Sequence, residues 1–326
     1  MQLALVGDTM LGRGVAEVLR ASGPEAIVAE EVASLLRAAD LCVLNLECCI
    51  SERGSPWPAP GKPFFFRAPP AAVDLLVRLG VDCVTLANNH ALDFGEEALL
   101  DTLAALGAAG IACVGAGADL TAARRPAVLE AKSYRLAVLG FTDHPAEYAA
   151  ESGRPGVAFA DLRGGIPAWL REAVGSCAAD GVLATPHWGP NLAAKPVRHV
   201  RIAADQLVAA GATLVAGHSA HCFHGVRGRV LYDLGDFVDD YAADPLLRND
   251  LGLLFLVTLG AKGPRRIEAV PLRVEYAHTR LADGEDAAWV RERFRAACAA
   301  LGTKVRMEGG RLVIDVSEPE ASERAG

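Results

Sequence analysis

The stretch Leu3-Ala4-Leu5-Val6-Gly7-Asp8 is an apolar run that ends on a glycine and a carboxylate. A short apolar run closed by Gly-Asp is typical of a buried strand that turns at the edge of a sheet. Open α/β sheets bind ligands at the carboxyl ends of their strands. The stretch therefore predicts a sheet edge at which Asp8 projects toward a ligand.

The same arrangement recurs along the chain, where polar clusters directly follow apolar runs. These clusters are Asn45-Leu46-Glu47, Asn88-Asn89-His90, His187-Trp188-Gly189 and Gly217-His218-Ser219-Ala220-His221. Carboxylate, amide and imidazole groups at several strand ends are what a metal centre with many ligands requires. Imidazole suits Zn or Fe, and carboxylate with carbonyl oxygen suits Mn. We therefore expect one or two divalent metals, with Mn, Fe or Zn favoured.

The order of elements predicts an α/β fold. Apolar runs at 41–46, 83–87 and 111–114 alternate with helical periodicity at 28–38, 71–79 and 96–106, which predicts a parallel sheet covered by helices. After residue 127 strands dominate, with helices expected at 162–178, 197–210 and 286–301. Two packed mixed sheets, each faced by helices, account for this mixture. We expect a single domain over residues 1–316 and a polar, frayed tail at 317–326.

Composition excludes several classes of function. A hydrophobic content of 52% with 22% charged residues describes a globular protein with ample core. The net charge of −8 and the absence of any Lys/Arg run argue against a nucleic-acid partner. No apolar stretch approaches the roughly 20 residues that a membrane helix needs. An expected strand begins at the first residues of the sequence, so the cytoplasm is the default location. The eight cysteines lack CxxC spacing and are expected to be reduced thiols.

Each cluster also has a simpler interpretation. Asp8 alone would more often cap a helix beginning near Leu11, and Asp93 would more often cap a helix beginning at Gly95 than orient His90. A lone His187 would more often be a core residue. The three histidines 218, 221 and 224 within one short segment are harder to explain structurally, with His224 the most doubtful ligand. The acids between Tyr232 and Asp240 either fix histidine tautomers or form a solvated loop.

Taken together, these motifs resemble the CapA family of capsule and poly-γ-glutamate synthesis proteins, which has the calcineurin-like metallophosphoesterase fold. The resemblance rests on Gly7-Asp8-Thr9-Met10-Leu11-Gly12-Arg13, Asn45-Leu46-Glu47, Ala87–Gly95, His187-Trp188-Gly189, Gly217–His221 and Leu231–Phe237, in order from about residue 2 to residue 275. It implies a four-layer α/β/β/α sandwich with one or two metals.

The resemblance also implies roles for single residues. The implied metal ligands are Asp8, Glu47, Asn89, His187, His218 and His221, and His90 is the implied acid that protonates a leaving group. Arg13 either pairs with an acid or holds an anionic substrate group, and Asp93 joins His90 as a candidate catalytic residue. The chain departs from the wider superfamily at Met10, where a histidine ligand is replaced, and in the His-x-x-His spacing of residues 218 and 221.

Three functions fit this reading. The first is a metal-dependent hydrolase of phosphoester or related anionic bonds. The second is a peptide-modifying enzyme, acting by γ-glutamyl transfer or hydrolysis or by epimerisation at a peptide Cα, with His90 as acid and base. The third is a non-catalytic protein that binds polymer. The expected partner is a small molecule, a peptide or polyglutamate, and the sequence does not define the oligomeric state.

Overall fold

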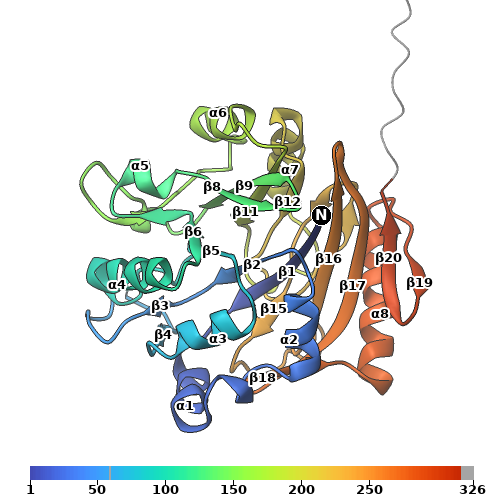
Figure 1. Cartoon of the computed structure of the whole chain (residues 1–326), viewed down its shortest axis with the longest axis horizontal. Coiled ribbons are helices and arrows are strands. Elements are labelled where there is room, and N and C mark those ends of the chain that lie inside the picture. The colour runs from blue at the N-terminus through green and yellow to red at the C-terminus, as the bar shows by residue number, and fades with distance from the viewer. Residues whose placement is uncertain (59, 317–326) are drawn as a thin grey trace, which may run out of the picture.

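Two large mixed sheets form the centre of the fold (Figure 1). The computed structural model describes residues 1–58 and 60–316, so the tail expected at 317–326 lies outside the described residues. The 10-stranded sheet runs in the order β19 (Arg306–Glu308), β20 (Arg311–Asp315), β17 (Gly263–Glu275), β16 (Leu251–Gly260), β1 (Gln2–Thr9), β2 (Leu41–Leu46), β5 (Cys83–Thr85), β6 (Ala112–Val114), with β15 (Asp236–Val238) beside β1 and β18 (His278–Leu281) beside β17.

The second sheet has six strands. Its order is β13 (Val226–Arg227), β14 (Val230–Leu231), β12 (Leu214–Ala216), β11 (Gly181–His187), β9 (Tyr134–Thr142), β8 (Ala127–Ala131). Strands β9, β11, β12 and β14 are parallel, and β8 and β13 are antiparallel to their neighbours. Two short pairs, β3 (Cys49–Ile50) with β4 (Arg67–Ala68) and β7 (Ala116–Gly117) with β10 (Gly156–Val157), lie outside these sheets.

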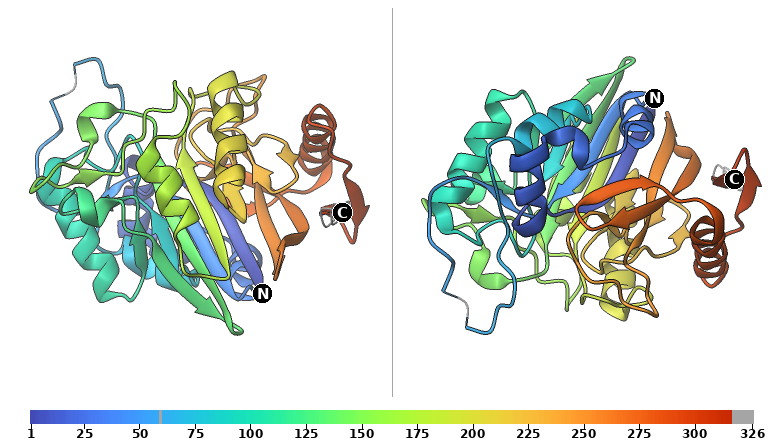
Figure 2. Two further views of the ribbon diagram at one scale, coloured as in Figure 1. Left: turned by 90° about the horizontal axis from the view of Figure 1, so that it is seen from above. Right: turned by 90° about the horizontal axis from the view of Figure 1, so that it is seen from below.

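Helices cover both outer faces, so the expected four-layer α/β/β/α sandwich is confirmed (Figures 1 and 2). The 10-stranded sheet is covered by α1 (Arg13–Ser22), α2 (Glu30–Arg37), α3 (Ala72–Arg78) and α4 (Gly95–Ala108). The six-stranded sheet is covered by α5 (Leu120–Ala123), α6 (Ala168–Gly175) and α7 (Arg198–Ala210). Short 3-10 turns occur at Pro24–Ala26 and Ala146–Tyr148.

Alternation along the strands separates the layers of the core. Ala4 and Val6 of β1 pack under the outer helices, whereas Leu3 and Leu5 face the second sheet. Successive side chains of a strand point to opposite faces, so both faces of a fully buried strand must be apolar. The helix α8 (Gly284–Ala299) closes one end of the core between the sheets with Val290, Phe294 and Cys298.

Some elements differ from the sequence-based expectation. The helix expected at 162–178 begins only at Ala168, because Gly165 has φ +96° and Pro167 precedes the first turn. The strand expected at 83–87 ends at Thr85. Strand β15 was not expected, because its short apolar part, Phe237-Val238, lies among acids.

The eight cysteines are free thiols, as expected. No helix within the described residues combines the length and apolarity that crossing a bilayer requires.

Candidate metal centre

The strand ends of the two sheets meet at one place. Asp8 lies near the end of β1, Glu47 directly follows β2, and Asn89 and His90 follow β5. His187 is the last residue of β11 and forms a bridge to His218, which follows β12. The predicted clusters come from both sheets, and parallel strands place their carboxyl ends at a shared edge.

Asp8 is the central carboxylate of this edge and is fully buried. Its Oδ1 accepts a hydrogen bond from Asn45 Nδ2 at 2.7 Å, and its Oδ2 accepts one from the backbone N–H of Ser219 at 3.2 Å. The imidazole nitrogens His218 Nδ1 and His221 Nδ1 lie 3.6 and 3.4 Å from its two oxygens. The helix-capping interpretation of Asp8 is wrong, because the first turn of α1 is preceded by Gly12 and has no side-chain cap.

Two groups of buried side chains have the spacing to hold an ion. Asp8, His187 and His218 form the first group, and Asp8, His221 and Asp236 form the second. Within each group one donor atom of each residue lies within 4.8 Å of the others. His187 Nδ1 lies 2.9 Å from His218 Nδ1, and His221 Nδ1 lies 2.8 Å from Asp236 Oδ1. Asp236 was not among the expected ligands, and its place beside Asp8 comes from the pairing of β15 with β1.

Several donor atoms at this edge are buried without a hydrogen-bond partner. They are Glu47 Oε1, Asn89 Oδ1, His187 Nε2 and Asp236 Oδ2. Buried polar atoms in folded proteins nearly always have a partner, so each of these calls for one. The set of carboxylate, amide and imidazole donors fits a divalent ion such as Mn²⁺, Fe²⁺ or Zn²⁺.

Burial shifts the protonation of these groups in the protein without a metal. The pKa of Glu47 is raised well above its usual value, first by burial and then by the charge of Asp8. The pKa of Asp236 is likewise raised well above its usual value, by burial and by Asp239. Burial lowers the pKa of His218 to about 4 and lowers that of His187 well below its usual value. The imidazoles are therefore neutral at neutral pH, as metal ligands must be.

An amide network holds the two carboxylates in place. Asn45 Nδ2 donates to Asp8 Oδ1 and, at 3.0 Å, to Glu47 Oε2. Asn88 Nδ2 donates to Asn45 Oδ1 and to the carbonyl of Leu46, both at 2.9 Å. Asn88, the first amide after β5, therefore holds Asn45 in place, whereas Oδ1 of the second amide, Asn89, has no hydrogen-bond partner. In the sequence, this division of roles is signalled by Asn45-Leu46-Glu47 and Asn88-Asn89 alone.

His90 is held by Asp93. The ring nitrogen Nδ1 lies 2.6 Å from Asp93 Oδ2, and Nε2 lies 3.9 Å from Glu47 Oε1. Asp93 does not cap α4, so the capping interpretation is wrong and the orienting one fits the geometry. Lys62 Nζ lies 2.5 Å from Asp93 Oδ1, and Tyr148 Oη donates to the same oxygen at 3.3 Å. Lys62 comes from the loop at residues 51–63, here called the proline-rich loop because it contains Pro56, Pro58, Pro60 and Pro63. Lys62 was not expected at the site.

Arg13 and His224 lie apart from the two ion-holding groups. Arg13 Nε pairs with Asp240 Oδ2 at 3.2 Å, and its guanidinium lies 4.6 Å from the centre of the Phe64 ring. Pairing with an acid was one of the two roles expected of Arg13. His224 Nε2 is 2.6 Å from the carbonyl oxygen of Ala193.

Three further histidines, His144, His199 and His278, lie outside the predicted clusters. The ring of His144 lies 5.0 Å from that of His187, and His144 Nδ1 is 2.5 Å from Asp143 Oδ1. His199 Nε2 lies 3.2 Å from Asp143 Oδ2, so one carboxylate bridges both rings. The ring nitrogen His278 Nδ1 lies 2.7 Å from the carbonyl oxygen of Ala26. The contact between His144 and His187 has no signal in the sequence, because the two residues lie far apart along the chain.

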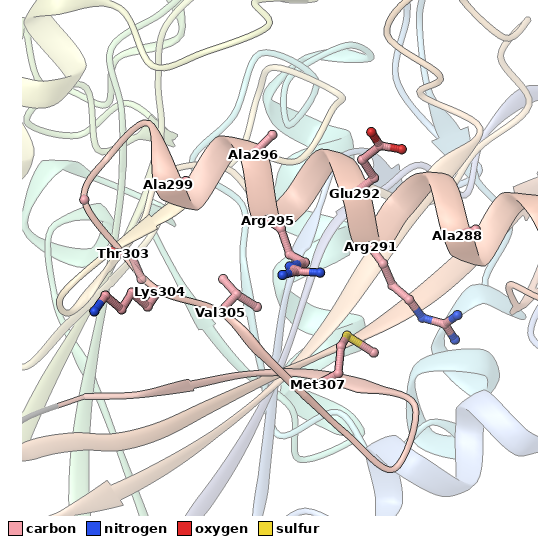
Figure 3. A pocket seen from close by; sticks show the side chains of 11 residues that line it. Ala288, Arg291, Glu292, Arg295, Ala296, Ala299, Thr303, Lys304, Val305 and Met307 are labelled. Carbon is pink, nitrogen blue, oxygen red and sulfur yellow. The ribbon is translucent and has the colours of Figure 1, made fainter.

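A cavity of about 520 Å³ opens beside His90 and His221. Its walls come from residues 62–64, from the segments that follow β5, β11 and β12, and from the segment after β15. The lining residues are Lys62, Pro63, Phe64, Asn89, His90, Asn191, Leu192, His221, Tyr241, Ala242, Ala243, Asp244, Pro245 and Asn249. Trp57 donates its backbone N–H to Asp93 O at 2.8 Å and packs against Tyr148, so this residue of the loop is held close to Asp93. A larger hollow of about 980 Å³ lies between α8 and the β19 segment, and none of the expected site residues lines it (Figure 3).

Known proteins are similar to this chain in sequence and in fold. The family model described as "Bacterial capsule synthesis protein PGA_cap" matches residues 2–241. A "Probable polyglutamine synthesis accessory protein" of Mycobacterium tuberculosis is 33% identical over 92% of both chains. The "PGA biosynthesis protein CapA" of Bacillus subtilis is 29% identical over 85% of this chain and 72% of that protein. A solved structure described as a novel phosphatase of Mycoplasma pneumoniae has a TM-score of 0.50 at 12% identity, over 84% of this chain and 93% of that one, which shows a shared calcineurin-like phosphoesterase fold.

Proposed function

The chain belongs to the bacterial capsule synthesis family PGA_cap, and on that premise we propose that it is a metal-dependent hydrolase of phosphoester or related anionic bonds. One observation carries the proposal. Two groups of buried ligands share Asp8, and His221 of the second group lines the same cavity as His90. The relatives named for polyglutamine synthesis and for PGA biosynthesis, together with the capsule synthesis family, support a role in making or trimming a polymer of this kind.

The residues of this edge would hold one or two divalent ions. Asp8, His187 and His218 would hold one ion, and Asp8, His221 and Asp236 would hold another. Glu47 and Asn89 each add an oxygen with no other partner. When bound, such ions stabilise negative charge that develops on the substrate and activate water for attack.

His90 is proposed to move the proton. With the proton of the neutral ring assigned to Nδ1, which donates to Asp93, the Nε2 atom lies 3.9 Å from Glu47 Oε1 and can take up a proton. Burial lowers the pKa of His90, so the ring is neutral at neutral pH and can return a proton only after it has received one. The buried Asp93 fixes the ring orientation that this exchange requires.

The first test combines metal analysis with turnover. Protein purified without chelator is expected to contain Mn, Fe or Zn and to hydrolyse generic aryl mono- or diesters. His90→Asn is expected to reduce kcat by about 100-fold or more while leaving the metal content unchanged. His278→Asn is the matched control, because its ring nitrogen Nδ1 lies beside a backbone carbonyl away from the site.

The alternatives have distinct outcomes. Stoichiometric metal without turnover of any ester would contradict the hydrolase proposal. Exchange of a peptide Cα hydrogen for deuterium would then favour the peptide-modifying alternative. Absence of metal, with Asp8→Ala changing neither Tm nor metal uptake, would favour the polymer-binding alternative.

A further inference from the structure

The cavity beside His90 has one apolar wall of aromatic rings. Phe64 and Tyr241 line it, with ring centroids 5.5 Å apart. Tyr241 also packs edge-on against His221 at 5.5 Å, so the wall begins at the ligand cluster itself. Leu192, Pro245 and two alanines add further apolar surface. Leu192 is 47% exposed and Phe64 40%, although both are large apolar side chains.

The cations near this cavity are already paired inside the protein. Lys62 is the only Lys or Arg among the described residues that line it, and its ammonium is bonded to Asp93 and to the carbonyl of Asn89 at 2.6 Å. Arg13 is paired with Asp240, lies 4.6 Å from the centre of the Phe64 ring and is not among the residues that line the cavity. Neither cation is free to neutralise a charged ligand.

The rim carries a negative charge of its own. Asp244 lines the cavity, and its Oδ1 accepts the backbone N–H groups of Leu246 and Leu247 at 2.8 and 2.7 Å. These bonds lower the pKa of Asp244, so it stays ionised. A ligand with further negative charges along its length would meet this carboxylate and no free cation, and like charges in contact disfavour binding.

We propose that the cavity binds an uncharged planar or apolar group of the substrate, against Phe64, Tyr241 and Leu192, while the reacting anion lies at the ligand cluster. The inference rests on the proposed function and gives its substrate class. Aromatic walls bind flat groups through area burial and ring stacking. Further carboxylates of a longer substrate would therefore lie outside this space.

The test uses non-hydrolysable ligands that share one anionic group. Phenylphosphonate, methylphosphonate and 3-phosphonopropionate are titrated into Mn²⁺-loaded protein, and Kd is measured by calorimetry. Phenylphosphonate is expected to bind at least about tenfold more tightly than methylphosphonate, and the carboxylated ligand no better than methylphosphonate. Phe64→Ala and Leu192→Ala are expected to reduce this preference at unchanged metal content. Leu246→Ala is the matched control, since Leu246 is 83% exposed and does not line the cavity.

A parallel series separates this inference from the hydrolase proposal. Phenylacetate, acetate and malonate replace the phosphonates and carry the same contrast of aryl, small and charged groups. If the aryl ligand binds more tightly than the small one only in the carboxylate series, the result would support the selectivity of the cavity and contradict phosphoester recognition. An equal or stronger affinity for the charged members of both series, or no binding of any member, would overturn the inference.

Discussion

Asp93 shows how a single side chain serves several contacts at once. Its Oδ2 accepts the backbone N–H of Phe66 at 2.6 Å and faces His90, and its Oδ1 faces Lys62 and Tyr148. A fully buried carboxylate is tolerated because every one of these partners donates a hydrogen bond or carries positive charge. The residue thus links the proline-rich loop to the ring that is proposed to move a proton.

Lys62→Met tests Lys62 as a positioning residue. Lys62 lowers the pKa of His90 through its charge, after the larger effect of burial, so removing it raises that pKa. We expect kcat to fall about tenfold with KM little changed, and the acidic limb of the pH–rate profile to move to higher pH. Lys132→Met is the control, because Lys132 is paired with Asp40, outside the site. An unshifted pH profile would assign Lys62 a purely structural role.

At the scale of elements, the pairing of β15 with β1 decides the composition of the second ligand group. The register places Asp8 opposite Asp236. Sequence patterns gave no indication of this, because the strand is short and lies in an acidic segment. The carboxylate nevertheless lies where the second ligand group needs an oxygen donor.

Asp236→Asn is expected to weaken metal binding. The change keeps the shape of the side chain and removes the charge next to His221, so we expect loss of one equivalent of metal or a 10- to 100-fold weaker Kd. Metal content after dialysis and calorimetric titration with Mn²⁺ would show it. Asp233→Asn is the contrast, because that carboxylate bonds the backbone N–H groups of Ala220 and Gly235. It should lower Tm with or without metal.

The close approach of β1 to the segment before β15 requires a glycine. A Cβ on Gly7 would lie 1.8 Å from the carbonyl oxygen of Gly235. Gly7→Ala is therefore expected to cost at least about 2 kcal/mol of stability, because backbone must move. Urea unfolding measures the effect. Gly107→Ala is the control, since nothing lies within 4 Å of its Cβ, and it should be neutral or mildly stabilising. Equal effects at both positions would contradict the argument.

At the scale of the whole molecule, the two sheets enclose a set of buried acids that repel one another. Glu47, Asp233 and Asp236 all have raised pKa values, chiefly because of burial. A carboxyl group whose pKa is raised in the folded state stabilises the fold at low pH, and this contribution is lost as pH rises through the raised pKa. Bound cations would replace the lost protons.

Metal should therefore matter more to stability as pH rises. We expect the Tm difference between metal-loaded and chelator-treated protein to be larger at about pH 8 than at about pH 5, since protons compete with the metal for Glu47 and Asp236. The neutral imidazoles add to the same trend, because acid protonates them. Thermal unfolding at both pH values, with and without chelator, provides the measurement. A Tm difference that is constant or larger in acid would show that these groups do not bind the metal.

Prediction from sequence succeeded where the signal is local. The apolar run before Asp8 and the histidines at 187, 218 and 221 indicated strand ends. The reason is that a run of apolar side chains and its periodicity can be recognised within a few residues of sequence. The same local reading failed for Asp93 and Asp8, which were more readily explained as helix caps. A carboxylate before a helix looks the same in sequence whether it caps the helix or faces another strand.

The sequence by itself determined the layered α/β class and the kinds of donor present at the strand ends. Only the tertiary structure decided which donors meet. Asp8 contacts the Ser219 backbone across 211 residues, and Lys62 reaches Asp93 from a loop that carries no periodic pattern. The physical reason is that hydropathy fixes which face of each strand is buried, whereas the order and register of strands across two sheets fix which strand ends become neighbours.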